Sequence, residues 1–208
     1  MIERHDTKIR ILDAAEKLFG INGFDVTSLR DITTEAHVNL AAVNYHFQSK
    51  DSLIDAVIQR RLEPVNNRRI AMLDAAGPNP TIEQIVEAFA APPIEAGLSP
   101  IVPLMGRILS TPDQFISRVF QKHLKVVVQR FTAAMTAAAP DLTPEERMWR
   151  MHFMGGAMAH VLSWSHILPE LSGGLCDTSD RKATTSRLVR FVAAGFRAQE
   201  GKLKNASS

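Results

Sequence analysis

Residues 27–47 read TSLRDITTEAHVNLAAVNYHF, and this stretch decides the fold. Ser28 stands three residues before Asp31, which is the spacing of a capping box, so a short helix is expected at about 28–36. After a brief connector, a second helix of two turns is expected at 40–47. Two short helices joined by a turn form a helix-turn-helix.

Apolar periodicity predicts a longer helix on each side of this pair. The first is an amphipathic helix at about 6–21, which Asn22 and Gly23 end because they tolerate positive φ. The second begins after Ser49, a candidate N-cap, and covers about 50–76. Three helices followed by a long fourth one thus make up the N-terminal part of the chain.

The rest of the chain is also helical by periodicity. Because Pro64 lies within the fourth helix, a kink or an offset of one turn is expected there. Further helices are expected at about 81–97, 100–111, 113–138, 144–168 and 180–200. The predicted fold class is therefore all-α, with a three-helix helix-turn-helix domain at 1–50 and a larger helical domain at 51–208, linked by the fourth helix.

Composition indicates an ordinary globular chain. Of 208 residues, 45% are hydrophobic and 22% are charged, and the single Cys176 cannot form an intramolecular disulfide. No stretch approaches the ~18 consecutive apolar residues that span a bilayer, and the N-terminus lacks the apolar region of a signal peptide. We therefore expect a cytoplasmic protein with no membrane partner.

Charge is distributed unevenly. Residues 1–60 carry 7 Lys and Arg against 9 Asp and Glu, whereas residues 181–208 carry 7 against 1. Net charge alone would not select the N-terminal part as a nucleic-acid binder, so that hypothesis depends on individual residues.

These N-terminal motifs resemble the DNA-binding region of TetR-family transcriptional repressors. The resemblance covers roughly residues 8–60 and rests on ILDAAEKLF at 11–19, Gly23-Phe24, TSLRDI at 27–32, VNLAAVNYHF at 38–47 and Ser49-Lys50. A second resemblance, to PsrA-type fatty-acid-responsive regulators, rests on NLAAVNYH at 39–46, WRMHFMGGA at 149–157 and FVAAGFR at 191–197. Residues 64–112 show little likeness to that group.

The second helix of the motif has the side chains that a major-groove reader needs. Small residues at its start allow close approach, Asn44 can read a base edge, and Leu40 or Ala41 can touch a thymine methyl. The predicted DNA-binding residues are Thr27, Ser28, Arg30, Leu40, Ala41, Asn44, Tyr45, His46 and Lys50. Other interpretations remain open: Tyr45 as a half-buried core aromatic, His46 as a surface residue and Asn44 as an uninvolved polar position.

In the larger domain, the family resemblance implies an effector pocket enclosed by the helices before residue 168. A methionine and aromatic stripe supplies its predicted walls, although most of these side chains are expected to be plain core. Arg107, His152 and His160 are candidates to meet a ligand headgroup, with Arg107 equally consistent with a surface position. The predicted pocket residues are Met105, Arg107, Ile108, Phe120, Leu124, Phe131, Trp149, His152, Phe153 and His160.

The last two helices are long and carry small or apolar faces, so we expect them to form a four-helix bundle with a second copy. The predicted dimer-interface residues are Gly156, Ala159, Ser163, Leu188, Phe191, Val192 and Gly195.

The sequence gives little support for an enzymatic function. There is no H-E-x-x-H zinc motif, no G-x-S-x-G nucleophile motif and no glycine-rich phosphate loop, so neither a metal nor another cofactor is expected. The leading hypothesis is a homodimeric repressor that binds a palindromic double-stranded operator. A small apolar effector, a fatty acid or acyl-CoA by the second resemblance, would release it. The alternatives are a helical protein-interaction or ligand-binding module without DNA binding, and a metal-dependent helical enzyme.

Overall fold

The structure, a computed structural model, describes residues 2–96 and 117–199, and every regular element within those ranges is a helix. This confirms the all-α prediction. The elements are α1 (Ile2–Asn22), α2 (Leu29–Glu35), α3 (Leu40–Phe47), α4 (Lys50–Ala75), α5 (Ile82–Glu95), the π-helical turn η1 (Phe120–Leu124), α8 (Lys125–Ala138), α9 (Pro144–Trp164), α10 (Leu168–Leu171) and α11 (Arg181–Arg197). The helix expected at 100–111 lies outside the described residues.

The described residues fall into two compact units. The first unit contains those of Met1–Arg68 and Ala96–Val128, and the second contains those of Arg69–Glu95 and Gln129–Ser208. Both α4 and α8 contribute residues to each unit. The domain division expected from the sequence, at residue 50, stays a prediction.

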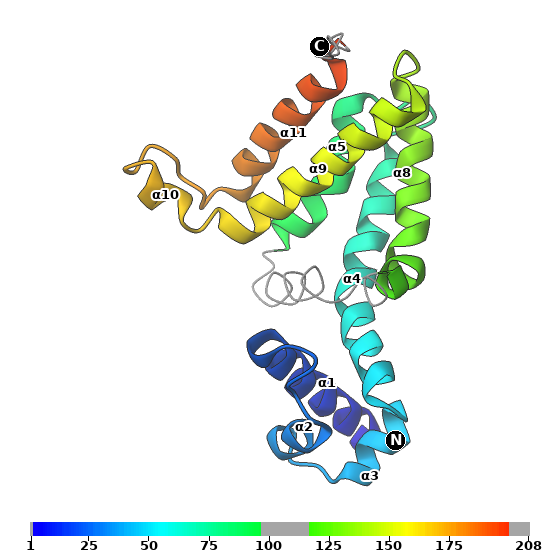
Figure 1. The fold of residues 1–208 in the computed structure, drawn as a ribbon, viewed down its shortest axis with the longest axis vertical. Helices are drawn as coiled ribbons and strands as arrows, with labels where there is room; N and C mark the ends of the chain where they lie inside the picture. The colour runs from blue at the N-terminus through cyan, green and yellow to red at the C-terminus, as the bar shows by residue number, and fades with distance from the viewer. Residues whose placement is uncertain (1, 97–116, 200–208) are drawn as a thin grey trace, which may run out of the picture. The chain divides into compact units, whose positions relative to one another are not determined.

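In the first unit, α1, α2 and α3 surround a shared apolar core together with the beginning of α4 (Figure 1). Phe19 and Phe24 are buried there with ring centroids 5.3 Å apart, so Phe24 packs under the first helix as expected. The other fully buried side chains of this core include Ile11, Ile32, Val43, Leu53, Val57 and Ile58.

The turns of this unit are only partly those expected. Gly23 adopts a φ of 90° and ends α1, whereas Asn22 is still helical, so the positive φ expected for Asn22 is wrong. Two residues other than glycine take left-handed conformations instead: His37, between α2 and α3, and Gln48, at the end of α3. α4 continues through Pro64 to Ala75.

In the second unit, α11 packs chiefly against α5, and α9 contacts both (Figure 1). Phe89 and Phe131 meet edge to face at 5.4 Å in its interior. Arg150 Nη1 donates to the carbonyls of Gly195, Phe196 and Ala198 at 2.8–2.9 Å. This buried guanidinium supplies donors to carbonyls at the C-terminus of α11, where a helix leaves its last carbonyls short of backbone donors.

Two helix boundaries differ from the expectation. α9 ends at Trp164 rather than near residue 168, and a separate short helix, α10, begins at Leu168 with Pro169 in its first turn. Proline suits that position because the first turn of a helix needs no N–H donor there. α8 is preceded by the π-helical turn η1 rather than by continuous α-helix.

Candidate functional site

The N-terminus of α2 is built by a capping box. The Asp31 N–H donates to Ser28 Oγ at 3.2 Å, and the Ser28 N–H and hydroxyl donate to Asp31 Oδ2 at 2.8 Å and 2.7 Å. These hydrogen bonds to Ser28 hold the pKa of Asp31 below its ordinary value. The predicted capping box is confirmed, and Ser28 and Arg30 are both exposed on this helix.

Thr27 is not available to DNA. Its side chain is 1% exposed, and its hydroxyl donates to the Gly23 carbonyl at 2.8 Å and to the Leu18 carbonyl at 3.3 Å. The contact predicted for Thr27 is therefore wrong, since the hydroxyl ties the α1–α2 loop to the end of α1.

α3 presents one buried and one exposed face. Asn39 Oδ1 accepts the Ala42 N–H at 2.9 Å and starts the helix, while Val43 and Phe47 are buried in the core. The opposite face is accessible and consists of Leu40, Ala41, Asn44 and Tyr45. These four residues are among those predicted to bind DNA, and they share one surface.

Tyr45 and His46 form the far edge of this surface. Tyr45 is 67% exposed, which excludes the core-aromatic interpretation. Its ring meets the half-buried imidazole of His46 edge to face at 5.1 Å. An aromatic hydroxyl held outward in this way can donate to a phosphate oxygen.

Lys50 lies at the start of α4, where Ser49 Oγ accepts the Ser52 N–H at 3.1 Å and caps the helix as expected. Lys50 Nζ donates to the Asp25 carbonyl at 3.2 Å. Because an ammonium has three donors, this bond still allows Lys50 to approach a phosphate.

Many acids of the first unit are paired with cations, some from distant positions in the chain. Lys17 contacts Glu35 at 2.6 Å, and Arg60 contacts Asp13 at 2.6 Å. Three cations from beyond residue 60 join them: Arg61 pairs with Glu16, Arg118 with Asp51 at 3.0 Å and Lys122 with Asp55 at 2.7 Å. The sequence analysis predicted none of these five pairs, because spacing along the chain does not reveal long-range ion pairs.

The predicted pocket residues do not share one environment. Met105, Arg107 and Ile108 lie outside the described residues. Leu124 packs against the first unit's core, Phe120 is 37% exposed and Phe131 is fully buried. Trp149, His152, Phe153 and His160 are all exposed on α9, so the enclosed position expected for these four is not observed in the single chain.

Arg69 is a buried cation that the sequence analysis missed. Arg69 is 5% exposed, and burial lowers its pKa to about 10. Its Nε donates to the Phe89 carbonyl at 2.8 Å, its guanidinium carbon lies 4.4 Å from the Phe89 ring centroid, and Nη2 lies 3.3 Å from Met158 Sδ. Helical spacing could have revealed it, because Arg69 is four residues from both Val65 and Leu73, which are buried on the same stripe of α4.

The predicted dimer residues divide into two groups. Leu188 and Val192 are buried in their own chain, on the helix that packs against α5, so their assignment to an interface is corrected. Phe191, Gly156 and Gly195 are exposed. Ala159 and Ser163 are half-buried on α9.

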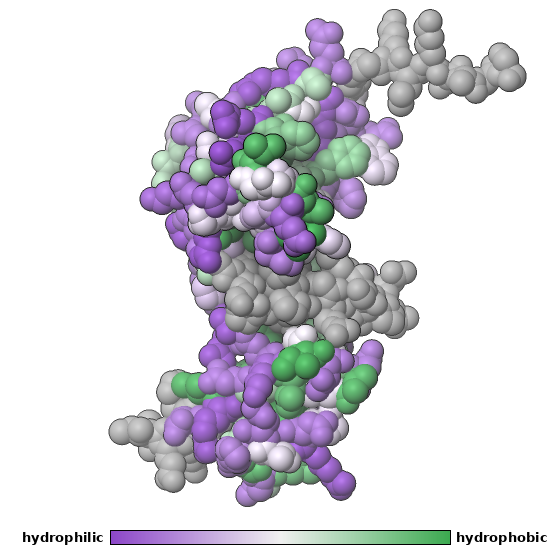
Figure 2. Space-filling view, turned by 90° about the vertical axis from the view of Figure 1, so that its left-hand side faces the viewer, coloured by the Kyte–Doolittle hydropathy of each residue, from purple (hydrophilic) through white to green (hydrophobic). Residues whose placement is uncertain are grey.

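The exposed face of α9 is rich in aromatic rings. Trp149 stacks on Phe153 with centroids 5.8 Å apart, and His160 stacks on Trp164 at 6.1 Å. With Phe191 of α11, these residues expose a large apolar area. Figure 2, viewed from the side of α10 and α11, shows apolar side chains among polar ones on this unit.

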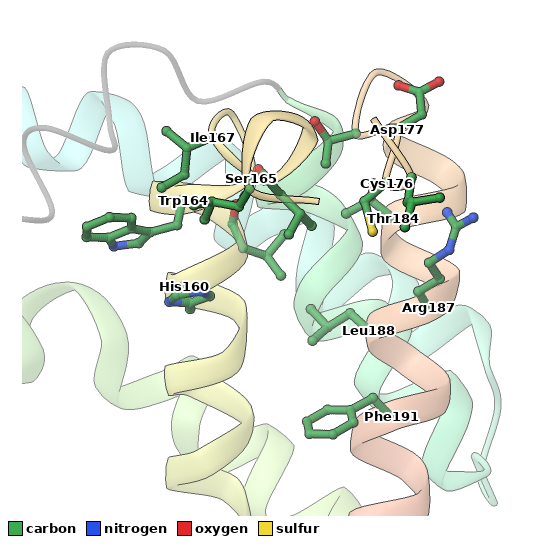
Figure 3. Close-up of a pocket in the computed structure, with 15 residues that line it drawn as sticks. His160, Trp164, Ser165, Ile167, Cys176, Asp177, Thr184, Arg187, Leu188 and Phe191 are labelled. Atoms are coloured by element: carbon green, nitrogen blue, oxygen red, sulfur yellow. The ribbon is translucent and has the colours of Figure 1, made fainter. Parts of the chain in front are cut away.

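A pocket of about 610 Å³ lies beside this face (Figure 3). Its walls come from the end of α9, from α10, from the loop that follows α10 and from α11. Leu188 and Phe191 point toward α9 across it. Its other apolar lining residues are Val161, Trp164, Ile167, Leu168, Leu171 and Leu175, of which Trp164, Leu168, Leu171 and Leu175 are exposed.

Within residues 2–96 and 117–199, no three His, Cys, Asp or Glu side chains gather as metal ligands would. Over the same ranges, no helix has the length and apolar character that crossing a membrane requires. Cys176 is exposed at the rim of the pocket.

Comparison with known families matches both ends of the chain. Residues 11–57 match the model described as bacterial regulatory proteins, tetR family, and residues 87–195 match the model described as tetracyclin repressor-like, C-terminal domain.

Curated relatives match over part of the chain. The probable HTH-type transcriptional regulator YttP of Bacillus subtilis is 37% identical over 57 residues, which are 27% of this chain and 28% of that protein. The negative regulator IcaR of the biofilm operon icaADBC in Staphylococcus aureus is 31% identical over 80 residues, 38% of this chain and 42% of that one. The chain therefore spans less than half the length of these relatives, which are regulators and not enzymes.

Solved structures match over nearly the whole chain. A tetR-family regulatory protein from Rhodococcus RHA1 has a TM-score of 0.67 at 16% identity, covering 90% of this chain and 95% of that one. The fatty acid degradation regulator FadR from Bacillus halodurans has a TM-score of 0.66 at 11% identity, covering 93% and 97%. At these identities the likeness establishes the fold.

Proposed function

Since the chain belongs to the TetR family of bacterial regulatory proteins, we propose that it is a homodimeric repressor that binds a palindromic operator and is released by an apolar effector with an anionic end. The exposed face of α3 carries this proposal. Leu40, Ala41 and Asn44 lie on this face. Val43 and Phe47, on the opposite face, are buried in the core. A helix that packs on the core with one face and carries small side chains on the other can enter a major groove.

The residues around α3 suit phosphate contacts. Tyr45 and Arg30 are exposed, and Lys50 lies at the start of α4. Contacts from these side chains would orient α3 without reading sequence. Thr27 has no part in the proposed surface, because its hydroxyl is committed to backbone carbonyls.

Dimerisation would use the exposed aromatic face of α9 together with Phe191 of α11. Exposed apolar surface of this kind marks an interaction site. A Cβ built at Gly156 or at Gly195 meets no atom within 4 Å, so both positions leave room for an approaching helix. The pocket beside α10 borders the same face through Trp164 and Phe191, and a second copy would cover it. The helix-turn-helix units of the two copies would then lie about 34–36 Å apart, or a multiple of that distance.

An apolar effector is supported by the interior of the second unit. Phe131, Met135 and Met154 are buried there, and methionine walls adapt to flexible apolar ligands. The resemblance to PsrA-type regulators suggests a fatty acid or its coenzyme A thioester.

Operator selection from a random duplex library tests the DNA-binding part. We expect recovery of a palindrome whose affinity falls steeply with salt. Recovery of no preferred sequence would favour a helical module without DNA binding.

Titration of the operator complex with carboxylates of increasing chain length tests the effector. Release should strengthen with each methylene, by about 0.8 kcal/mol when the group is buried. A response that does not depend on chain length would contradict a fatty-acyl effector.

A further inference from the structure

The pocket of about 610 Å³ between α9, α10 and α11 lies entirely within the second unit (Figure 3). Its volume falls in the range of about 300–1,000 Å³ that small-molecule sites occupy. Several of its apolar side chains are accessible to water, and Leu171 and Leu175 are 74% and 89% exposed. Apolar surface that is both concave and exposed indicates a binding site.

Apolar and polar groups occupy different parts of this pocket. On its α9 side the His160 ring stacks on Trp164 with centroids 6.1 Å apart, and Phe191 points toward them from α11. A set of polar lining residues lies where the loop after α10 meets the first half of α11: Cys176, Asp177, Thr184 and Arg187 (Figure 3). This separation suits a molecule with an apolar body and one polar end.

Arg187 is the cation that a ligand would meet at the polar end. Among the described residues that line the pocket, it is the only Lys or Arg, and it is exposed. Within residues 2–96 and 117–199 it interacts electrostatically with Asp177 and forms no hydrogen bond, so its N–H donors are open to a ligand. A guanidinium binds a carboxylate through two parallel hydrogen bonds.

Asp177 is less suited to bind a ligand than Arg187 is. Its Oδ1 accepts the Ser179 N–H at 2.8 Å. Hydrogen bonds to Ser179 hold the pKa of Asp177 below its ordinary value, with a smaller contribution from Arg187. The carboxylate is therefore ionised at neutral pH and already has a donor, whereas the guanidinium has no hydrogen-bond acceptor among the described residues. The pocket thus favours an anionic end over a cationic one.

Helical spacing directs such a ligand along α11. Arg187, Leu188 and Phe191 line the pocket at positions i, i+1 and i+4, and about 6 Å along the helix axis separates Arg187 from Phe191. Leu188 and Phe191 both point toward α9 across the pocket (Figure 3). The body of a molecule whose anionic end is held at Arg187 would therefore lie over these two side chains.

We propose that this pocket binds an apolar molecule with one carboxylate, which pairs with Arg187 and extends past Phe191 to Trp164. This inference rests on the proposed function, because it locates the effector of that same regulator. It moves the headgroup contact from the exposed His152 to Arg187. The second copy, which would cover the pocket at Trp164 and Phe191, would enclose the ligand.

Two brominated probes of equal chain length, 10-bromodecanoate and 10-bromodecanol, locate the site. Bromine quenches a tryptophan that it contacts, and the chain has two tryptophans, Trp149 and Trp164. Trp149→Phe leaves Trp164 in the pocket, so both probes should quench its fluorescence. Trp164→Phe leaves Trp149, which does not line the pocket and lies about 22 Å away along α9, so quenching should be lost.

Equal quenching in these two variants would place the probes elsewhere and overturn the proposal. Absence of quenching in Trp149→Phe would overturn it as well, and is the result expected if the second copy fills the pocket instead of covering it.

Arg187→Gln tests the headgroup contact, with binding to the full-length protein measured by calorimetry at pH 7.5. The parent should bind 10-bromodecanoate about tenfold more tightly than 10-bromodecanol, on the scale of one charge-assisted hydrogen bond. Arg187→Gln should lose that preference and bind the alcohol as before. Arg190→Gln is the matched control, because Arg190 is also exposed on α11 but does not line the pocket. Equal losses in the two variants would mean that overall charge attracts the carboxylate, and would overturn the assignment.

Asp177→Asn should have the opposite effect. It removes the negative charge beside Arg187 and keeps an oxygen that can accept the Ser179 N–H, so 10-bromodecanoate should bind about two- to threefold more tightly and 10-bromodecanol as before. Equal changes for both probes would contradict a carboxylate at this end of the pocket.

Operator binding by the parent is measured in parallel. A parent that retains its operator but shows no preference for 10-bromodecanoate would refute the role of Arg187 and leave DNA binding standing. A parent that prefers 10-bromodecanoate but binds no operator would refute the repressor function instead.

Discussion

The guanidinium of Arg118 lies 3.0 Å from the carboxylate of Asp51, the residue that follows Lys50. One helical turn further along both segments, Lys122 Nζ lies 2.7 Å from Asp55. Two acids near the start of α4 are thus neutralised by cations that come from much later in the chain. Residues 1–60 carry more acids than bases, and this arrangement reduces the negative charge that the proposed DNA-binding unit would present to phosphates.

Opposite effects are expected from removing the two members of the Arg118–Asp51 pair. Arg118→Gln should weaken operator binding by about 0.5–1 kcal/mol, the scale of an exposed ion pair, because Asp51 then repels phosphate. Asp51→Asn should strengthen binding by a similar amount, and the double variant should return to the parent value. Fluorescence anisotropy at several salt concentrations measures all three. If both single variants weakened binding, the pair would position α4 rather than neutralise charge.

Substitutions on α3 and α4 should distinguish side chains that read bases from side chains that bind phosphates. Asn44→Ala should relax preference at one base pair by about 1–3 kcal/mol if the side chain makes a bidentate contact. Lys50→Ala should weaken binding to all sequences alike and reduce the slope of log affinity against log salt by about 1. Competition assays with single-base operator variants distinguish the two. Unchanged binding in both variants would refute the proposed reading surface.

Thr27 should affect stability and not recognition. Thr27→Val keeps the shape of the side chain but leaves the Gly23 carbonyl without its buried donor, so the free energy of unfolding should fall by about 1–3 kcal/mol. Operator affinity of the folded fraction should stay at the parent value. Thr34→Val is the control, since its hydroxyl bond to the Arg30 carbonyl is exposed. Urea unfolding measures both variants, and a specific loss of DNA binding in Thr27→Val would contradict this role.

Local chemistry made the N-terminal fold predictable. The capping box of Ser28 and Asp31 and the cap at Ser49 are read directly from residue spacing, and the structure contains both. The left-handed conformations of His37 and Gln48 were not predictable, because neither residue is glycine, although local hydrogen bonds such as that from the Val38 N–H to the Thr33 carbonyl form around them at the helix ends.

The second unit was less predictable from the sequence, for a physical reason. Periodicity shows that a helix has an apolar face, but not whether that face meets the same chain or another one. Leu188 and Val192 are buried in their own chain, whereas the equally apolar Phe191 is exposed. The same ambiguity explains why Trp149 and Phe153 were expected in a pocket, although they are exposed on α9.

The α9–α11 face should control assembly. Phe191 is 72% exposed in the single chain, so Phe191→Asp should leave each protomer folded. In a dimer the same aspartate would be buried without a partner, which costs about 3–5 kcal/mol, and operator affinity should collapse because a single head makes half the contacts. Ser186→Asp is the control, since it adds the same charge at an exposed position of α11 that lies on a different side of the helix. Light scattering across a concentration series reports the mass, and circular dichroism checks the fold. A Phe191→Asp protein that remains dimeric at the parent's concentration range would show that the copies meet elsewhere.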